Sequence, residues 1–178
     1  MYTITKIIIK DIKNNKGKLI AYNEDNIILE SEAYIGKNGI TENKIEGDGK
    51  TPIGKYKLGI CFGTHKKEEI QNDNYNEINE NIYWVDDVKS KYYNQMVDIR
   101  TTTKDWNGGE HLIEYKIQYE YAVEIKTNPL NIPYKGSAIF LHCSICKPTQ
   151  GCIAIETSIM EKIINKINEN TVIEILNC

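Results

Sequence analysis

The sequence predicts a mainly β fold with one amphipathic helix near the C-terminus. Two observations support this prediction. Most of the readable segments alternate polar and apolar residues with a period of two, as strands with one buried face do. One segment, residues 157–170, instead repeats its apolar residues with helical spacing. The length of 178 residues suits one ordinary core, and no linker rich in proline, glycine or serine divides the chain, so we expect residues 1–178 to form a single domain.

Residues 115–126 show the clearest strand pattern. Ala122 is the one interruption of the polar face, so we expect a strand that is buried on one side. Six apolar side chains share the other face: Tyr115, Ile117, Tyr119, Tyr121, Val123 and Ile125. Shorter segments with a similar pattern predict further strands at residues 18–22, 26–35, 54–60, 81–87 and 171–176.

Residues 157–170 are expected to form a helix that covers a sheet. Ser158 and Glu161 have the spacing of a capping box at its start. Its apolar stripe consists of Ile159, Met160, Ile163, Ile164 and Ile167. By contrast, residues 64–81 are polar, rich in asparagine and without periodicity, which predicts a long surface loop or, as the alternative, a lid over a site.

The charge balance argues against two classes of partner. The chain has 22 basic and 25 acidic residues, for a formal charge of −3, which provides neither the basic surface that nucleic acids require nor a polybasic patch for anionic lipid. Its longest apolar runs are shorter than a membrane span or a signal h-region. We therefore expect a soluble protein with a small or peptidic partner, either cytoplasmic or separated from a leader or anchor.

Three of the five cysteines lie together with a histidine in the segment "HCSICKPTQGC", residues 142–152. His142, Cys143, Cys146 and Cys152 could bind zinc, although adjacent residues of a strand point to opposite faces and no second ligand pair is present. Cys143 and Cys146 could instead form a redox pair, but the helix N-terminus that would activate such a pair is absent here.

The third interpretation is nucleophilic catalysis by Cys152 with His142 as its base. A thiol attacks a carbonyl only as the thiolate, so it needs a nearby imidazole to accept its proton. Gly151 lets a substrate approach closely, and its N–H, with that of Cys152, could form an oxyanion hole. The carbonyl of Cys143 could orient the imidazole ring. From the spacing alone, all three interpretations remain open.

The segment "GSAIFLHCSICKPTQGCIAI" resembles the catalytic motif of YkuD-type L,D-transpeptidases, in which a histidine precedes a [Ser/Thr]-x-Gly-Cys element. The upstream "GDGKTPIGKYKLG", with its Thr-Pro-x-Gly core, and the later "YWVDD", "GEHL" and "YAVEI" are similar to further parts of these domains. The resemblance covers residues 35–176.

The resemblance implies a β-sandwich-type catalytic domain with one C-terminal helix, which acts on peptidoglycan stem tetrapeptides without a cofactor. Cys152 would attack the carbonyl of the third residue and expel D-alanine, and an amine would then accept the acyl group. His142 would be the base, with the Cys143 carbonyl as its orienting group, Gly151 in the oxyanion hole and Thr149 at the Ser/Thr position. Water as the acceptor would make the protein an L,D-carboxypeptidase. The family resemblance implies the cell envelope or secretion, whereas the absence of a signal peptide leaves a cytoplasmic location open.

This chain departs from the family pattern at three places. Gln150 stands where a second histidine is usual, Ala154 stands where an arginine is common, and the interval from His142 to Cys152 is short. For substrate binding we expect contributions from Gln150 and from the segment at residues 98–115. In that segment the candidates are Arg100 for a carboxylate, Trp106 for the cleft wall, and Glu110 with His111 for an amine.

Overall fold

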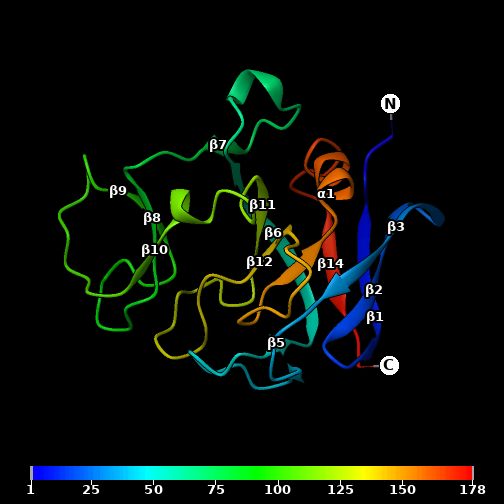
Figure 1. Cartoon of the computed structure of the whole chain (residues 1–178), viewed down its shortest axis with the longest axis horizontal. Helices are drawn as coiled ribbons and strands as arrows, with labels where there is room; N and C mark the ends of the chain where they lie inside the picture. The colour runs from blue at the N-terminus through cyan, green and yellow to red at the C-terminus, as the bar shows by residue number, and fades with distance from the viewer. Residues whose placement is uncertain (1, 178) are drawn as a thin grey trace.

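The computed structural model describes residues 2–177, and most of its strands form one large sheet (Figure 1). The strand order in this sheet is β11-β12-β13-β3-β2-β1-β14-β6-β7. Its members are β1 (Lys6–Lys13), β2 (Lys16–Asn23), β3 (Asn26–Tyr34), β6 (Gly54–Gly63), β7 (Tyr75–Glu77), β11 (Tyr121–Ile125), β12 (Phe140–Cys143), β13 (Ile153–Ile155) and β14 (Val172–Ile175). The predictions of a mainly β fold and of one helix near the C-terminus are confirmed.

The large sheet closes on itself because β11 pairs with both β12 and β6. The first and last strands also meet, since β1 pairs in parallel with β14. The β1–β2 hairpin turns through Asn14 and Asn15, both with positive φ, a conformation that matches the twist of antiparallel strands. The two faces of the predicted sandwich thus belong to one continuous sheet.

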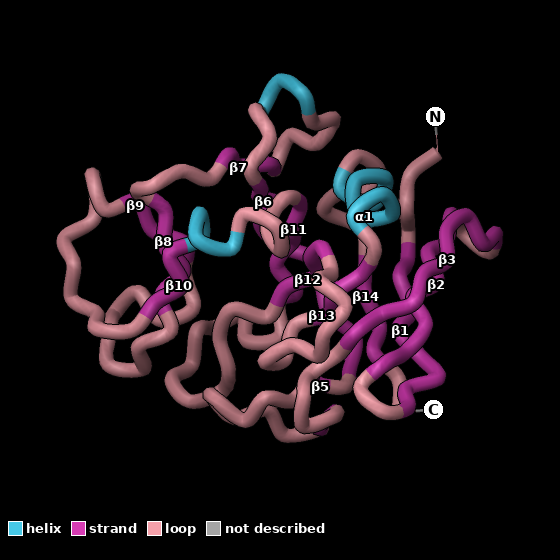
Figure 2. The backbone as a smooth tube through the Cα atoms, viewed as in Figure 1, coloured by secondary structure: helices cyan, strands magenta, loops and turns pink. Residues whose placement is uncertain are grey.

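Smaller elements lie outside this sheet, and loops account for much of the remaining chain (Figure 2). A three-stranded sheet has the order β10-β8-β9, and a two-stranded pair joins β4 to β5. These elements, with two short 3₁₀ helices, are β4 (Ile40–Thr41), β5 (Thr51–Pro52), β8 (Ile82–Val85), β9 (Met96–Asp98), β10 (Gly109–His111), η1 (Lys67–Glu69) and η2 (Leu112–Tyr115). Over residues 2–177, no helix is long and apolar enough to cross a membrane.

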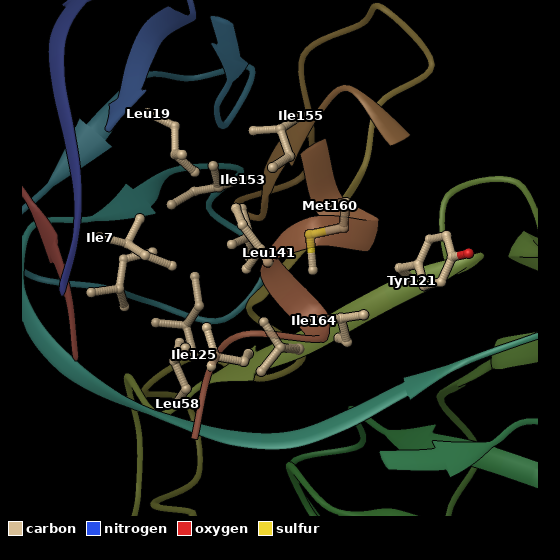
Figure 3. Packing of buried hydrophobic residues seen from close by; sticks show 14 of the residues in the cluster. Ile7, Leu19, Leu58, Tyr121, Ile125, Leu141, Ile153, Ile155, Met160 and Ile164 are labelled. Carbon is tan, nitrogen blue, oxygen red and sulfur yellow. The ribbon is translucent and has the colours of Figure 1, made fainter. Parts of the chain in front are cut away.

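Helix α1 (Thr157–Ile164) packs its apolar side against the sheet, as its sequence pattern predicts. Figure 3 shows Met160 and Ile164 facing Leu141 and Ile125 in the main core. The predicted capping box is wrong, because the N-cap position is Glu156, two residues before Ser158. Ser158 lies inside the helix, its hydroxyl donates to the Glu156 carboxylate, and Glu156 occupies the N-cap position without a capping side-chain bond.

The strand predicted over residues 115–126 is correct only in its second half. Tyr115 ends η2 and Ile117 is 63% exposed, so strand pairing begins at Tyr121. β11 is also buried on both faces. Ala122 packs in a second, aromatic cluster with Phe62, Trp84, Tyr119 and Phe140, whereas the other face of the strand joins the main core. Ala122 thus lies on a second buried face of β11, where a small side chain packs against the aromatic cluster.

Residues 64–81 are attached to the sheet edge and are not a free surface loop. β7 pairs in parallel with the end of β6, and Ile70, Tyr75 and Ile78 are buried. The side-chain amide of Asn72 donates to the Ile164 carbonyl at 2.8 Å, which joins this segment to α1. The prediction of a surface loop is wrong because the mainly polar segment contains a few buried apolar residues.

Candidate active site

His142 and Cys152 lie on neighbouring parallel strands. His142 belongs to β12 and is in register with Ala154 of β13, and Cys152 directly precedes β13. Both residues line one pocket of about 230 Å³. This pocket is also lined by Glu110, Tyr115, Gln118, Tyr119, Ile145, Lys147, Pro148, Thr149, Gln150 and Ala154. Residues 64–81 contribute nothing to it, so the structure does not support the lid alternative.

The imidazole of His142 is held in one orientation. Its Nδ1 lies 2.8 Å from the backbone oxygen of Cys143. A carbonyl oxygen can only accept, so Nδ1 carries the proton and Nε2 is left as the basic nitrogen. Burial lowers the pKa of His142 to about 4, with the bond to Cys143 opposing that shift. The ring is therefore neutral at neutral pH and able to accept a proton.

The Cys152 thiol is held by the segment that enters β12. Its Sγ donates to the carbonyl oxygen of Ala138 at 3.1 Å and accepts from the N–H of Phe140 at 3.3 Å. Burial, with a further contribution from the charge of Glu110, raises the pKa of the thiol to about 12. At rest the proton therefore stays on sulfur.

The turn before Cys152 is fixed by hydroxyl groups. The Thr149 hydroxyl donates to the Cys152 carbonyl at 2.6 Å and accepts from the Gly151 N–H at 3.1 Å. Buried Thr51, from the Thr-Pro-x-Gly segment, donates to the Gly151 carbonyl at 2.8 Å. The Gly151 N–H is therefore engaged and not free for an oxyanion, contrary to expectation, and Cys152 N–H is the remaining candidate donor.

Gly151 itself is required by backbone geometry. Its φ is +139°, a conformation that L side chains rarely adopt. A Cβ at this position would lie 2.9 Å from the backbone oxygen of Lys50. A larger residue would displace the turn that positions Cys152.

Glu110 and Tyr119 form a pair on the pocket wall beside His142. The Tyr119 hydroxyl donates to the Glu110 carboxylate, and the Tyr119 ring meets the His142 ring edge-on, with centroids 5.5 Å apart. Burial raises the pKa of Glu110 to about 7, and the bond from Tyr119 opposes this shift in part. Sequence reasoning missed Tyr119 as a pocket residue because its position on the apolar face of an alternating segment indicated only a core residue.

Three of the expected substrate-binding residues lie outside the pocket. Arg100 pairs with Asp98 at 2.6 Å on an exposed turn. Trp106 is buried in a small cluster with Val85 and Val97. His111 stacks on Tyr83 and bonds to Glu80 and Glu114. The structure brings Glu110, Thr149 and Gln150 to the pocket but not these three.

The described residues do not provide a set of zinc ligands. Across residues 2–177, no three His, Cys, Asp or Glu side chains are grouped in a way that could hold a metal ion. His142 faces the pocket, whereas the Cys143 side chain lies in the main core on the other face of β12. Cys146 is exposed, and it and Cys143 are free thiols. The geometry favours the nucleophile interpretation over the metal and redox ones.

The raised pKa of Glu110 predicts a specific pH dependence of stability. The native state keeps a proton that the unfolded state releases, so the free energy of unfolding should fall as pH rises from about 4.5 to about 7. The Glu110→Gln variant should lack this loss, which we expect to be on the order of 1–3 kcal/mol. Urea unfolding of both proteins at pH 4.5 and 7.5 measures the difference.

The matched control for this experiment is Glu114→Gln, at a nearby exposed carboxylate. Its unfolding free energy should follow that of the wild type across the same pH range. Parallel pH curves for wild type and Glu110→Gln would show that Glu110 titrates as an ordinary exposed carboxylate.

Comparison with known proteins agrees with this geometry. The family model YkuD, described as the L,D-transpeptidase catalytic domain, matches residues 5–175. No curated protein and no solved structure matches the chain.

Proposed function

The chain belongs to the YkuD family of L,D-transpeptidase catalytic domains, and we propose that it catalyses cysteine-dependent L,D-transpeptidation of peptidoglycan stem tetrapeptides. One observation carries this proposal: Cys152 and His142 line the same pocket from adjacent strands, with His142 Nε2 left available as a base. The family relates to the cell wall, so the proposed place of action is the cell envelope or its exterior.

In the proposed first half-reaction, Cys152 attacks the carbonyl carbon of the third residue of the stem peptide. The thiol proton passes to His142 Nε2 as the C–S bond forms. The tetrahedral intermediate collapses, the C–N bond to D-alanine breaks, and His142 returns the proton to the departing amine. The product is a thioester on Cys152 and free D-alanine.

In the second half-reaction, the amine of another stem peptide attacks the thioester. His142 takes the proton from that amine and passes it to the departing sulfur, which restores the resting thiol. The pocket supplies the contacts that this chemistry needs. The N–H of Cys152 and the exposed Gln150 amide are the proposed donors to the oxyanion.

The pocket also offers charges of both signs to a zwitterionic substrate. We assign Glu110 to the ammonium group of the third residue, and Lys147 to a carboxylate. Lys147 replaces Arg100 in this assignment, because Arg100 pairs with Asp98 outside the pocket.

The alternative function is L,D-carboxypeptidase activity, in which water replaces the amine. Product analysis by mass spectrometry of a disaccharide-tetrapeptide incubated with the protein separates the two. A cross-linked dimer with loss of one alanine is the expected result for the transpeptidase. A tripeptide product without any dimer would identify a carboxypeptidase, and an unchanged tetrapeptide would contradict both.

A further inference from the structure

A buried lysine lies beside the catalytic turn and does not line the pocket of His142 and Cys152. The Lys44 side chain is 9% exposed, and its ammonium pairs with the carboxylate of Asp48. Asp48 is itself held by the backbone N–H groups of Ile45, at 2.9 Å, and Lys50, at 2.8 Å. A buried ammonium is costly without a partner, so this arrangement fixes one positive charge at a defined place.

That place adjoins the two backbone segments that hold Cys152. A Cβ at Gly151 would lie 3.2 Å from Lys44 Nζ, and a Cβ at Gly136 would lie 2.7 Å from Lys44 Cγ. Gly151 directly precedes Cys152, and Gly136 lies two residues before Ala138, whose carbonyl oxygen accepts a hydrogen bond from the Cys152 thiol. The absence of side chains at both glycines is what lets Lys44 approach so closely.

The loop that carries Lys44 is joined firmly to the catalytic turn. Thr51 bonds to the Gly151 carbonyl, and Gly36 forms a bridge with Thr149. The N–H of Lys37 also donates to the Thr149 carbonyl at 2.8 Å. These bonds lie on both sides of Lys44 in the sequence and hold its loop against the catalytic turn, and the pair with Asp48 holds the ammonium within that loop.

We propose that Lys44 is a positioning residue that supplies the positive charge stabilising the Cys152 thiolate, and that Asp48 limits the strength of this charge. The proposal rests on the proposed cysteine-dependent function but concerns the ionisation of the thiol itself. Five titratable residues line the pocket with Cys152, namely His142 from β12, Glu110 from β10, Tyr115 from η2, Tyr119 from the segment before β11 and Lys147 from the segment after β12, whereas Lys44 lies outside this lining, beside Gly151.

Among these groups, Lys44 and Glu110 have opposite effects. The charge of Lys44 lowers the pKa of the thiol, and that of Glu110 raises it. Lys44 is thus the cation that opposes the desolvation of the thiolate.

The rate of Cys152 alkylation by iodoacetamide, followed against pH by peptide mass spectrometry, tests the proposal without any peptidoglycan substrate. Lys44→Met should raise the apparent pKa of the thiol by about one, which lowers its alkylation about tenfold at a given pH. Asp48→Asn should act in the opposite direction, because it removes the negative charge beside Lys44. Lys44→Arg keeps the charge and should restore the wild-type profile.

The opposite directions of the two pKa shifts distinguish an electrostatic role of Lys44 from a structural one. Lys44→Met and Asp48→Asn break the same ion pair, so a purely structural role predicts shifts in the same direction and would overturn the proposal, as would an unchanged profile in Lys44→Met. Lys16→Met, which breaks an exposed ion pair with Glu32, is the matched control and should leave the profile unchanged. Should Lys44→Met fail to fold by circular dichroism, the shift in Asp48→Asn decides: faster alkylation supports the proposal and slower or unchanged alkylation refutes it.

These readouts also separate this proposal from the proposed function. A protein that leaves the tetrapeptide intact but shows the opposite shifts would refute the transpeptidase function and retain the role of Lys44. A protein that releases alanine without those shifts would refute only the role of Lys44.

Discussion

Replacing Cys152 with alanine is expected to abolish the release of D-alanine from a disaccharide-tetrapeptide, with a fall of about 10⁴-fold or more. The reason is that no thioester can form without the sulfur. Of the other described cysteines, Cys61 and Cys143 are buried in the main core, and Cys146 is exposed on the connecting turn. The measurement is the amount of alanine released per hour, determined by mass spectrometry.

The matched control is Cys146→Ala, which removes a thiol from the same turn. This variant should release alanine at nearly the wild-type rate, because the Cys146 side chain is exposed and does not line the pocket. Circular dichroism on both variants establishes that they fold. Substantial alanine release by folded Cys152→Ala would mean that another group is the nucleophile.

Replacing His142 with alanine is expected to lower alanine release by about 10²–10⁴-fold, the usual contribution of a positioned general base. The wild-type rate should also fall as pH drops toward 4, because protonation of Nε2 removes the base, and burial lowers the pKa of His142 to about that value. The residual activity of His142→Ala should lack this acid limb. Initial rates between pH 4 and 8 measure both effects.

His111→Ala is the control for His142→Ala, because the His111 ring stacks on Tyr83 outside the pocket. Its activity and its acid limb should remain close to those of the wild type. A large loss of activity in His111→Ala, together with an acid limb that persists in His142→Ala, would show that His142 is not the base.

The sequence predicts β2, β3, β6, β14 and part of β11 because strand periodicity is a local property, whereas β1, β7 and β13 are not among the predicted strands. It fails where the same alternation continues through a non-strand segment, as at Tyr115 and Ile117. It also cannot show that Ala122 faces a second cluster, since the aromatic residues of that cluster come from distant strands such as β6 and β12. The closure of the sheet through β11 and β6 depends on such long-range pairing.

In the candidate site too, the sequence predicts local features but not contacts between distant parts of the chain. His142 and Cys152 could be predicted as neighbours because only residues 144–152 separate β12 from β13. Arg100 could not be placed correctly, since Asp98, two residues away, engages its guanidinium on an exposed turn. Lys44 carried no signal, because a lysine between turn residues is usually solvated. Its burial results from two glycines that lie about a hundred residues further along the chain.

The central claim is that Cys152 carries the acyl group, and mass spectrometry of the protein after incubation with a disaccharide-tetrapeptide tests it most directly. A carbapenem, which acylates a reactive thiol, serves in parallel as a probe of the same atom. The predicted result is a covalent adduct on the peptide that contains Cys152 with both reagents, together with free alanine from the tetrapeptide. An unmodified Cys152 with an intact tetrapeptide, or an adduct on a different residue, would contradict the claim.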